Sequence, residues 1–98
     1  MDEDKLRASV LKKFLYNQKL CIQDKEFLKK LTFVLCSDNE QYYRKKLKEL
    51  SVLFNVSEML IMSKKFHYAL RYISMVKYVI KKMNEQMDKD FGKISKQI

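Results

Sequence analysis

The sequence predicts an all-α fold, a compact bundle of four to five helices in a single domain. The 98-residue chain has one glycine and no proline, so it lacks the residues that most turns and strand connections use. Apolar residues make up 47% of it, which is too many for a disordered chain. They recur at spacings of three and four, the period of a helix face. We expect an added N-terminal helix over residues 1–24, a core bundle over 25–88, and a tail over 89–98 that extends the last helix or frays.

The first two predicted helices each have an apolar face. The first runs from about Lys5 to Leu20, and its expected buried face consists of Leu6, Val10, Phe14 and Asn17, flanked by Leu11 and Leu15. Asp24 then offers a side-chain oxygen that caps a second helix. The stretch "CSDNE" ends that helix, whose apolar positions are Phe27, Leu28, Leu31, Val34 and Leu35.

A third helix is expected to start near Asp38, because Ser37 and Glu40 have the spacing of a capping box. In that motif each side chain satisfies a backbone N–H that the first helical turn leaves unpaired. The apolar face of this helix consists of Tyr43, Leu47, Leu50 and Phe54. Asn55 and Glu58 repeat the capping arrangement, so we predict a junction between the third and fourth helices at "FNVSE".

The strongest periodicity in the chain defines the fourth helix. Spacings of three and four alternate over four heptads, through Met59, Met62, Phe66, Ala69, Ile73, Val76, Ile80, Met83 and Met87. This pattern predicts the central and most buried helix, with Gly92 as its only obvious stop signal. A malleable methionine-rich peptide groove and an intermolecular coiled coil fit the same residues, but packing in the core is favoured.

Residue patterns that catalyse reactions or bind metals are nearly missing from the sequence. His67 is the only histidine, and no cysteine, serine or carboxylate is placed to form a relay with it. The chain has no glycine-rich phosphate loop and no zinc-ligand spacing. Cys21 and Cys36 are interpreted as reduced residues of the core or its boundary. We therefore expect a non-enzymatic protein with no catalytic residues, no cofactor and no metal.

The net charge of +9 favours an anionic partner. Lysine doublets are spread from Lys12–Lys13 to Lys81–Lys82, which favours solvated helix faces over a dedicated nucleic-acid surface. Tyrosines with nearby lysines and arginines are also typical of single-strand binders, so nucleic acid stays as the alternative partner. No apolar run approaches the ~20 residues that a membrane span needs, so we expect an intracellular protein without membrane contact.

The stretch from Phe27 to about Tyr78 has a recognisable order of short patterns. It contains "LCSDN" at the end of a short helix, "LKELSVL" in the next helix and "LRYI" in the last. In this order the stretch resembles the transcription factor IIS N-terminal domain family, and most closely its integrase-binding-domain branch, the kind found in lens epithelium-derived growth factor.

The resemblance implies a docking module of transcription or chromatin complexes, built as a compact bundle of four or five helices. In that branch, two loops at one end of the bundle hold short, disordered, acidic and aromatic motifs of partner proteins. By position, Asp38 would accept hydrogen bonds from backbone amides of the bound motif. The expected partner-binding residues are Ser37, Asp38 and Asn39 in the first loop, Val76, Lys77 and Tyr78 in the second, and the basic Arg71.

The sequence and the resemblance together predict a nuclear, non-enzymatic interaction module that is a monomer or a weak dimer. Its partners would be disordered peptide motifs of other proteins. The alternative is a basic helical protein that binds nucleic acid, or that forms a coiled-coil dimer through the stripe from Met59 to Met87.

Overall fold

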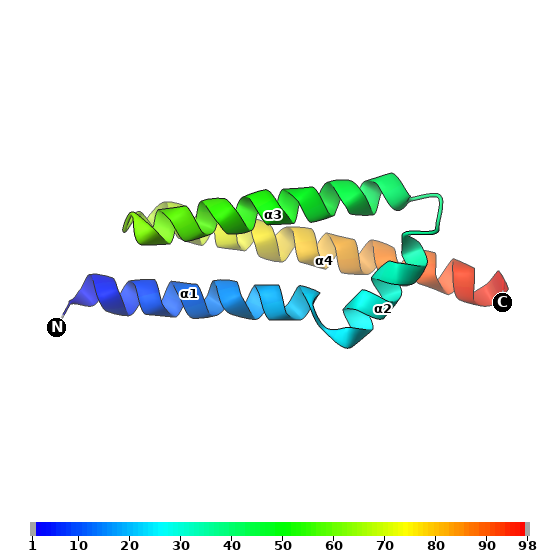
Figure 1. The fold of residues 1–98 in the computed structure, drawn as a ribbon, viewed down its shortest axis with the longest axis horizontal. Coiled ribbons are helices and arrows are strands. Elements are labelled where there is room, and N and C mark those ends of the chain that lie inside the picture. Colours follow the sequence, from blue (N-terminus) through cyan, green and yellow to red (C-terminus); the bar gives the residue numbers. More distant parts are fainter. Residues whose placement is uncertain (1, 98) are drawn as a thin grey trace.

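The fold was analysed in a computed structural model, which describes residues 2–97 and the side chains of residues 2–94. It is an all-α bundle of four helices, α1 (Glu3–Ile22), α2 (Lys25–Val34), α3 (Glu40–Met62) and α4 (Phe66–Gln97). The long helices α1 and α4 run in the same direction and α3 runs against them, while the short α2 crosses between α1 and α3 near one end (Figure 1). The bundle measures 58 × 21 × 15 Å, and its fold class agrees with the prediction.

The predicted N-terminal caps can be compared with the hydrogen bonds at the start of each helix. The Asp24 carboxylate accepts a hydrogen bond from the Glu26 N–H at 2.8 Å, so the predicted cap of α2 is confirmed. The predicted capping box of Ser37 and Glu40 is wrong. The Ser37 hydroxyl accepts from the Asn39 N–H at 3.2 Å, and the Glu40 carboxylate pairs with Arg44 at 2.8 Å instead of reaching back. Helix α3 therefore begins at Glu40, two residues later than expected.

The predicted junction at "FNVSE" is also wrong, because α3 passes through it without a break. Asn55 points to solvent, while Phe54 and Ile61 on either side of it pack in the core. Ser57 is fully buried, and its hydroxyl donates to the Leu53 carbonyl at 2.7 Å. Asparagine in a helix interior costs only about 0.7 kcal/mol relative to alanine. Burial of the flanking apolar residues outweighs that cost, and the helix continues.

The true junction between α3 and α4 lies at residues 63–65. The N–H of Lys65 donates to the Leu60 carbonyl at 2.9 Å, and the N–H of Lys64 donates to the Ile61 carbonyl at 3.1 Å. This pair of bonds is a Schellman motif, and Lys64 holds the left-handed position with a φ of 60°. The predicted core positions Met59 and Met62 end up at the exposed end of α3, with 67% and 76% of their surfaces accessible.

The core lies along α4, which packs mainly against α3 and has α1 and α2 on its flanks. Six residues of the predicted stripe are nearly or fully buried there: Ala69, Ile73, Val76, Ile80, Met83 and Met87. From Ala69 to Met87 this stripe is covered within the chain, which disfavours an intermolecular coiled coil through it; that alternative stays a prediction. Helix α4 passes the stop signal at Gly92 and continues to Gln97, so the tail extends the last helix, one of its two expected outcomes; Ile98, the last residue of the predicted tail, lies outside the described residues.

The N-terminal helix uses a different face from the predicted one. Leu11 and Leu15 are the buried residues of α1. The predicted buried residues Leu6, Val10 and Phe14 are 54%, 44% and 47% exposed. Helix α1 lies on the flank of the α3 and α4 pair and buries one narrow strip, although its apolar residues extend around more of its circumference. The physical reason for the error is that this broad apolar surface does not identify one inward side.

Candidate interaction surfaces

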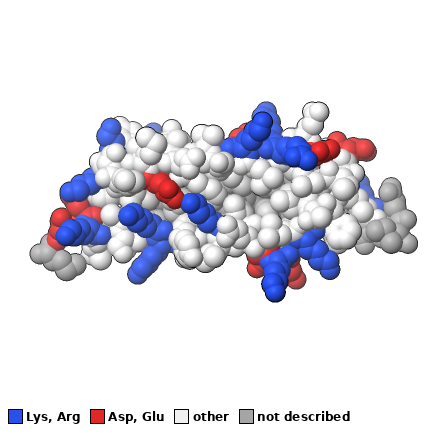
Figure 2. Space-filling model, in the orientation of Figure 1, with Lys and Arg blue, Asp and Glu red and all other residues white. Residues whose placement is uncertain are grey.

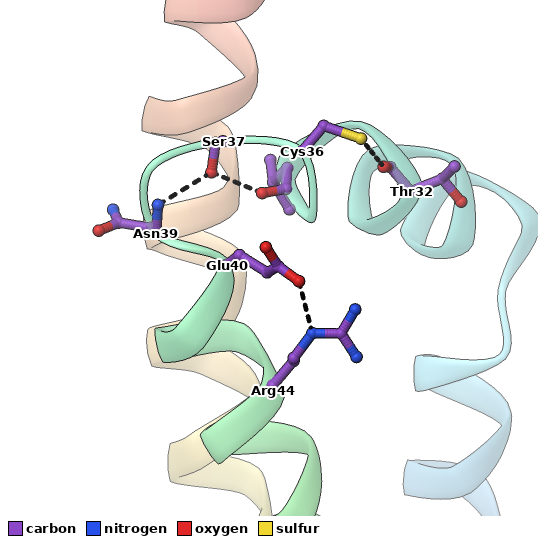
Figure 3. Close-up of polar contacts among 7 residues, drawn as sticks. Thr32, Cys36, Ser37, Asn39, Glu40 and Arg44 are labelled. Atoms are coloured by element: carbon purple, nitrogen blue, oxygen red, sulfur yellow. Dashed lines mark hydrogen bonds and ion pairs between the residues drawn. The ribbon is translucent and has the colours of Figure 1, made fainter.

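The loop between α2 and α3 contains the first predicted binding site and is closed by its own hydrogen bonds (Figure 3). The Ser37 hydroxyl donates to the Val34 carbonyl at 2.5 Å and accepts from the Asn39 N–H. The Cys36 thiol points back along α2 to the Thr32 carbonyl, 3.9 Å away. Asp38 is exposed at this loop, as a docking residue would be. Cys36 is an exposed free thiol, and so is Cys21, so both are unpaired as expected but neither lies in the core, one of the two positions predicted for them.

A buried carboxylate on α4 anchors this loop. Asp90 is 5% exposed, and it accepts hydrogen bonds from the Tyr43 hydroxyl at 2.5 Å, the Asn39 side-chain amide at 2.9 Å and the Gln86 side-chain amide at 3.1 Å. Burial alone would raise the pKa of Asp90, but these three bonds and the nearby Lys93 outweigh it and hold the pKa below its ordinary value. Burial, followed by the bond to Asp90, raises the pKa of Tyr43.

The Asp90 cluster was missed at the sequence level. Asp90 lies in "MDKDFG", where alternating acids and lysines are typical of a solvated helix end. Its partners Asn39 and Tyr43 come from about 50 positions earlier in the chain. Only the packing of α3 on α4 brings them together, and the spacing of buried Met83 and Met87 was the one available hint that this side of α4 faces inward.

The second predicted loop does not exist, because Val76, Lys77 and Tyr78 lie inside α4. Val76 is fully buried in the core and cannot form an exposed notch, whereas Arg71, Lys77 and Tyr78 are exposed on the helix. The α2–α3 loop contacts α4 at Asp90, twelve residues beyond Tyr78, which is about 18 Å along the helix axis. The two predicted groups of binding residues therefore do not form one site. A binding role for Ser37, Asp38 and Asn39 stays a prediction.

An open apolar groove lies where α1 and α4 run side by side, and we call it the α1–α4 groove. Its volume is about 720 Å³. Large apolar side chains from both helices line it: Leu6, Val10, Leu11 and Phe14 from α1, and Phe66 and Leu70 from α4. Apart from the buried Leu11 and the half-buried Phe66, these side chains are exposed. The groove is therefore a concave apolar surface open to solvent.

Basic side chains border the α1–α4 groove. Arg7, Lys64 and Lys65 line it and are exposed, and the Lys77 ammonium lies 5.2 Å from the centre of the Phe14 ring. Asp4 is the one acidic side chain among the described residues that line the groove. The rim is therefore positively charged around an apolar interior.

A second groove, between α1 and α3, differs in character. Lys5, Lys12, Lys13 and Lys19 line it, and the Lys19 ammonium is bonded to Glu58 at 2.7 Å. Figure 2 shows that charged side chains on one face of the molecule form separate clusters, with a broad uncharged area between them. Charge is thus unevenly distributed, and of these two grooves the α1–α4 groove offers the more continuous wall of large apolar side chains.

Comparisons with protein-family models, with curated proteins and with solved structures found nothing that matches this chain. The family resemblance therefore stays a prediction. None of the described helices is both long and apolar enough to cross a bilayer.

Proposed function

We propose that the protein is a non-enzymatic interaction module that binds a short apolar and acidic segment of a partner protein in the α1–α4 groove. One observation carries the proposal: Leu6, Val10, Phe14 and Leu70 stay exposed although they meet at a concave seam between two packed helices. Exposing a continuous group of large apolar side chains is unfavourable for an isolated domain, and such groups are typical of protein interfaces.

The rim defines the chemistry of the partner. Three basic side chains line the groove against one acidic side chain, and Lys77 adds a fourth positive charge beside Phe14. Acidic residues flanking the apolar anchors of a partner would be attracted to this rim, which raises the rate of encounter. A second copy of the chain fits poorly. Each copy carries a net charge of +9, and a symmetric dimer through this groove would place two basic rims against each other.

A short helix is the segment that best fits this seam. Helices pack into the groove between two other helices by inserting side chains spaced three and four residues apart. The exposed residues from Leu6 to Phe14 extend along about 12 Å of α1, or roughly two turns. A partner segment of this kind has the same acidic and aromatic character as the motifs that the family resemblance implies. Its setting in nuclear transcription or chromatin complexes rests on that resemblance alone.

The proposal is tested by an NMR titration of the full chain with an acidic amphipathic peptide. We expect amide shifts along Leu6–Phe14 and Phe66–Leu70, and we expect Leu70→Glu to weaken binding about ten-fold or more by placing a charge at an apolar contact. Leu28→Glu is the matched control, because Leu28 on α2 is exposed to a similar degree as Leu70. Shifts confined to the α2–α3 loop around Asp38, or an equal loss in both variants, would contradict the proposal.

A further inference from the structure

We propose that the solvent-facing side of α4 is a second, separate binding surface, whose ligand is single-stranded nucleic acid. The surface consists of Tyr68, Arg71, Met75, Tyr78 and Lys82, and we call it the α4 outer face. It goes beyond the proposed protein docking, because none of these residues except Tyr68 lines the α1–α4 groove.

The five residues of the α4 outer face form one line along the helix. Their spacings are three, four, three and four, so they share a face. This line lies opposite the buried stripe, since Ile73, Val76 and Ile80 between them point into the core. Tyr68, Met75 and Tyr78 are 57%, 50% and 61% exposed. Two open aromatic rings therefore stand about 15 Å apart along the helix axis, with Arg71 between them.

The charge of this segment has a single sign. From Glu58 to Glu85 the chain contains no other acidic residue, and its basic residues there are Lys64, Lys65, Arg71, Lys77, Lys81 and Lys82. A stretch of this kind attracts polyanions, and no carboxylate within it repels a phosphate. Arg71, Lys77, Lys81 and Lys82 are all exposed on α4.

One cation and one ring are already adjacent on the α4 outer face. The Lys82 ammonium lies 5.6 Å from the centre of the Tyr78 ring. It also lies 3.7 Å from the Glu85 carboxylate, an exposed pair that contributes little and that a phosphate can replace. An unpaired base stacked on Tyr78 would place its phosphate within reach of Lys82. This combination of open rings and neighbouring cations is how proteins bind single strands without sequence preference.

The shape of the surface favours a flexible polyanion over a folded partner. The side chains of the α4 outer face stand on the convex side of one helix, and the two tyrosines are separated by three helical turns. A partner helix needs a seam between two helices in which to bury a row of apolar side chains, and the chain offers that in the α1–α4 groove. A single strand needs only separate rings and cations, and its bases are free to stack because they are unpaired.

The test is a fluorescence anisotropy titration of the full chain with labelled oligothymidine and, separately, with a DNA duplex, at about 50 mM and 200 mM salt. We expect tighter binding of the single strand. Its affinity should fall with salt with a logarithmic slope of about −0.7 for each phosphate contacted, or roughly −2 to −3 for three or four cations.

Matched variants distinguish the stacking of bases on Tyr78 from the general attraction of a positively charged protein for nucleic acid. Tyr78→Ala should weaken oligothymidine binding about ten-fold. Tyr16→Ala should leave it unchanged, since Tyr16 is as exposed as Tyr78 but lies on α1. The double reversal R71E/K82E should abolish binding, whereas K45E/K48E on α3 makes the same change in net charge elsewhere and should reduce affinity only slightly. Circular dichroism confirms that each variant is folded.

Four results would overturn the proposal: no binding at the lower salt, tighter binding of the duplex, equal losses in the two charge reversals, or equal losses in the two tyrosine variants. A fifth is occupation of the α4 outer face by an acidic peptide that displaces the oligonucleotide, which would assign this face to protein. The first four results leave the protein-docking proposal intact, because its variants Leu70→Glu and Leu28→Glu are read with peptide alone. The fifth would also move peptide docking from the α1–α4 groove to the α4 outer face unless Leu70→Glu still weakens peptide binding.

Discussion

Among residues 2–97, Lys64 is the one non-glycine residue with a positive φ, a left-handed position that glycine adopts most easily. For a residue with a Cβ atom, the left-handed conformation costs about 1 kcal/mol or more of folding free energy. Glycine avoids this cost, but it loses more conformational freedom on folding, so only part of the cost is recovered by the substitution. We expect Lys64→Gly to raise the free energy of unfolding by about 0.5–1 kcal/mol, measured by urea denaturation. The control Lys65→Gly has no such strain to relieve and should not stabilise the protein.

The same residue explains why the junction between α3 and α4 could not be read from the sequence. Helix ends are recognised by glycine, asparagine or proline, and "SKK" contains none of them. The asparagine that did give a signal, Asn55, lies within a helix whose apolar neighbours are buried. In both predicted capping boxes the glutamate forms an ion pair instead of a cap: Glu40 pairs with Arg44, and Glu58 pairs with Lys19. Only the Asp24 cap, which needs no second side chain, was predicted correctly.

Asp90 makes stability depend on pH in the acid range. Its pKa in the folded protein is lowered, so the ionised carboxylate stabilises the fold above the unfolded-state pKa of about 3.9, and this contribution is lost as the pH falls through the folded-state value. Asp90→Asn should cost about 1–3 kcal/mol at neutral pH, because it leaves buried donors without an acceptor. The difference in the free energy of unfolding between Asp90→Asn and the wild type should become smaller as the pH falls toward 3.

Urea denaturation at several pH values measures that gap. Asp88→Asn is the matched control, since Asp88 also lies near the end of α4 but forms an exposed pair with Lys30. Its effect should be small at every pH. A gap between Asp90→Asn and the wild type that stays constant on acidification would show that the lowered pKa of Asp90 does not contribute.

At the level of the helices, α1 has one row of apolar residues buried in the core and another row exposed in the α1–α4 groove. Leu15 is 2% exposed, whereas Val10 in the α1–α4 groove is close to half exposed. Leu15→Ala should therefore lower the free energy of unfolding by about 2–5 kcal/mol, and Val10→Ala by less than about 1 kcal/mol. Thermal or urea unfolding of both variants measures the difference. Equal losses would mean that the groove side of α1 is packed, which would also remove the basis for docking there.

Helix α4 was predicted far better than α1, and the reason lies in how the apolar residues are distributed. From Phe66 to Met87 one unbroken line of apolar residues at spacings of three and four marks the core face of α4, although Tyr68, Leu70, Met75 and Tyr78 lie exposed outside that line. In α1, Leu6, Val10 and Phe14 form one apolar line and Leu11 and Leu15 form another. Either could have faced inward, and the choice depends on where α3 and α4 pack. The same ambiguity concealed the α1–α4 groove from the sequence.

At the level of the whole molecule, the composition and the periodicities were enough to predict an all-α bundle, but not the site. The α1–α4 groove and the Asp90 cluster each join residues distant in the chain: Phe14 meets Lys77, and Asn39 meets Asp90. The two predicted loops were assigned from a local pattern, and one of them is helix. Local patterns determine which segments are helical, whereas surfaces depend on how the helices are placed against each other.

Burial of the methionine-rich stripe within the chain leads to a prediction about assembly. Because the buried stripe is not exposed for pairing, and because two copies with a net charge of +9 repel each other, the isolated chain should be a monomer. Its melting temperature should then not depend on protein concentration, whereas a dimer melts at higher temperature as the concentration rises. Differential scanning calorimetry over a wide concentration range makes this measurement. A rising melting temperature would contradict the monomer and would require an interface outside the stripe.

The 58 Å length of the bundle has a practical consequence for any such study. The Cα radius of gyration is 15.8 Å, compared with about 12.6 Å for a typical compact domain of this length. A rod diffuses more slowly than a sphere of equal mass, so a gel-filtration column calibrated with spherical standards will overstate the mass of the monomer. An elution volume in the dimer range would then reflect hydrodynamic shape, and light scattering is needed to obtain the mass itself.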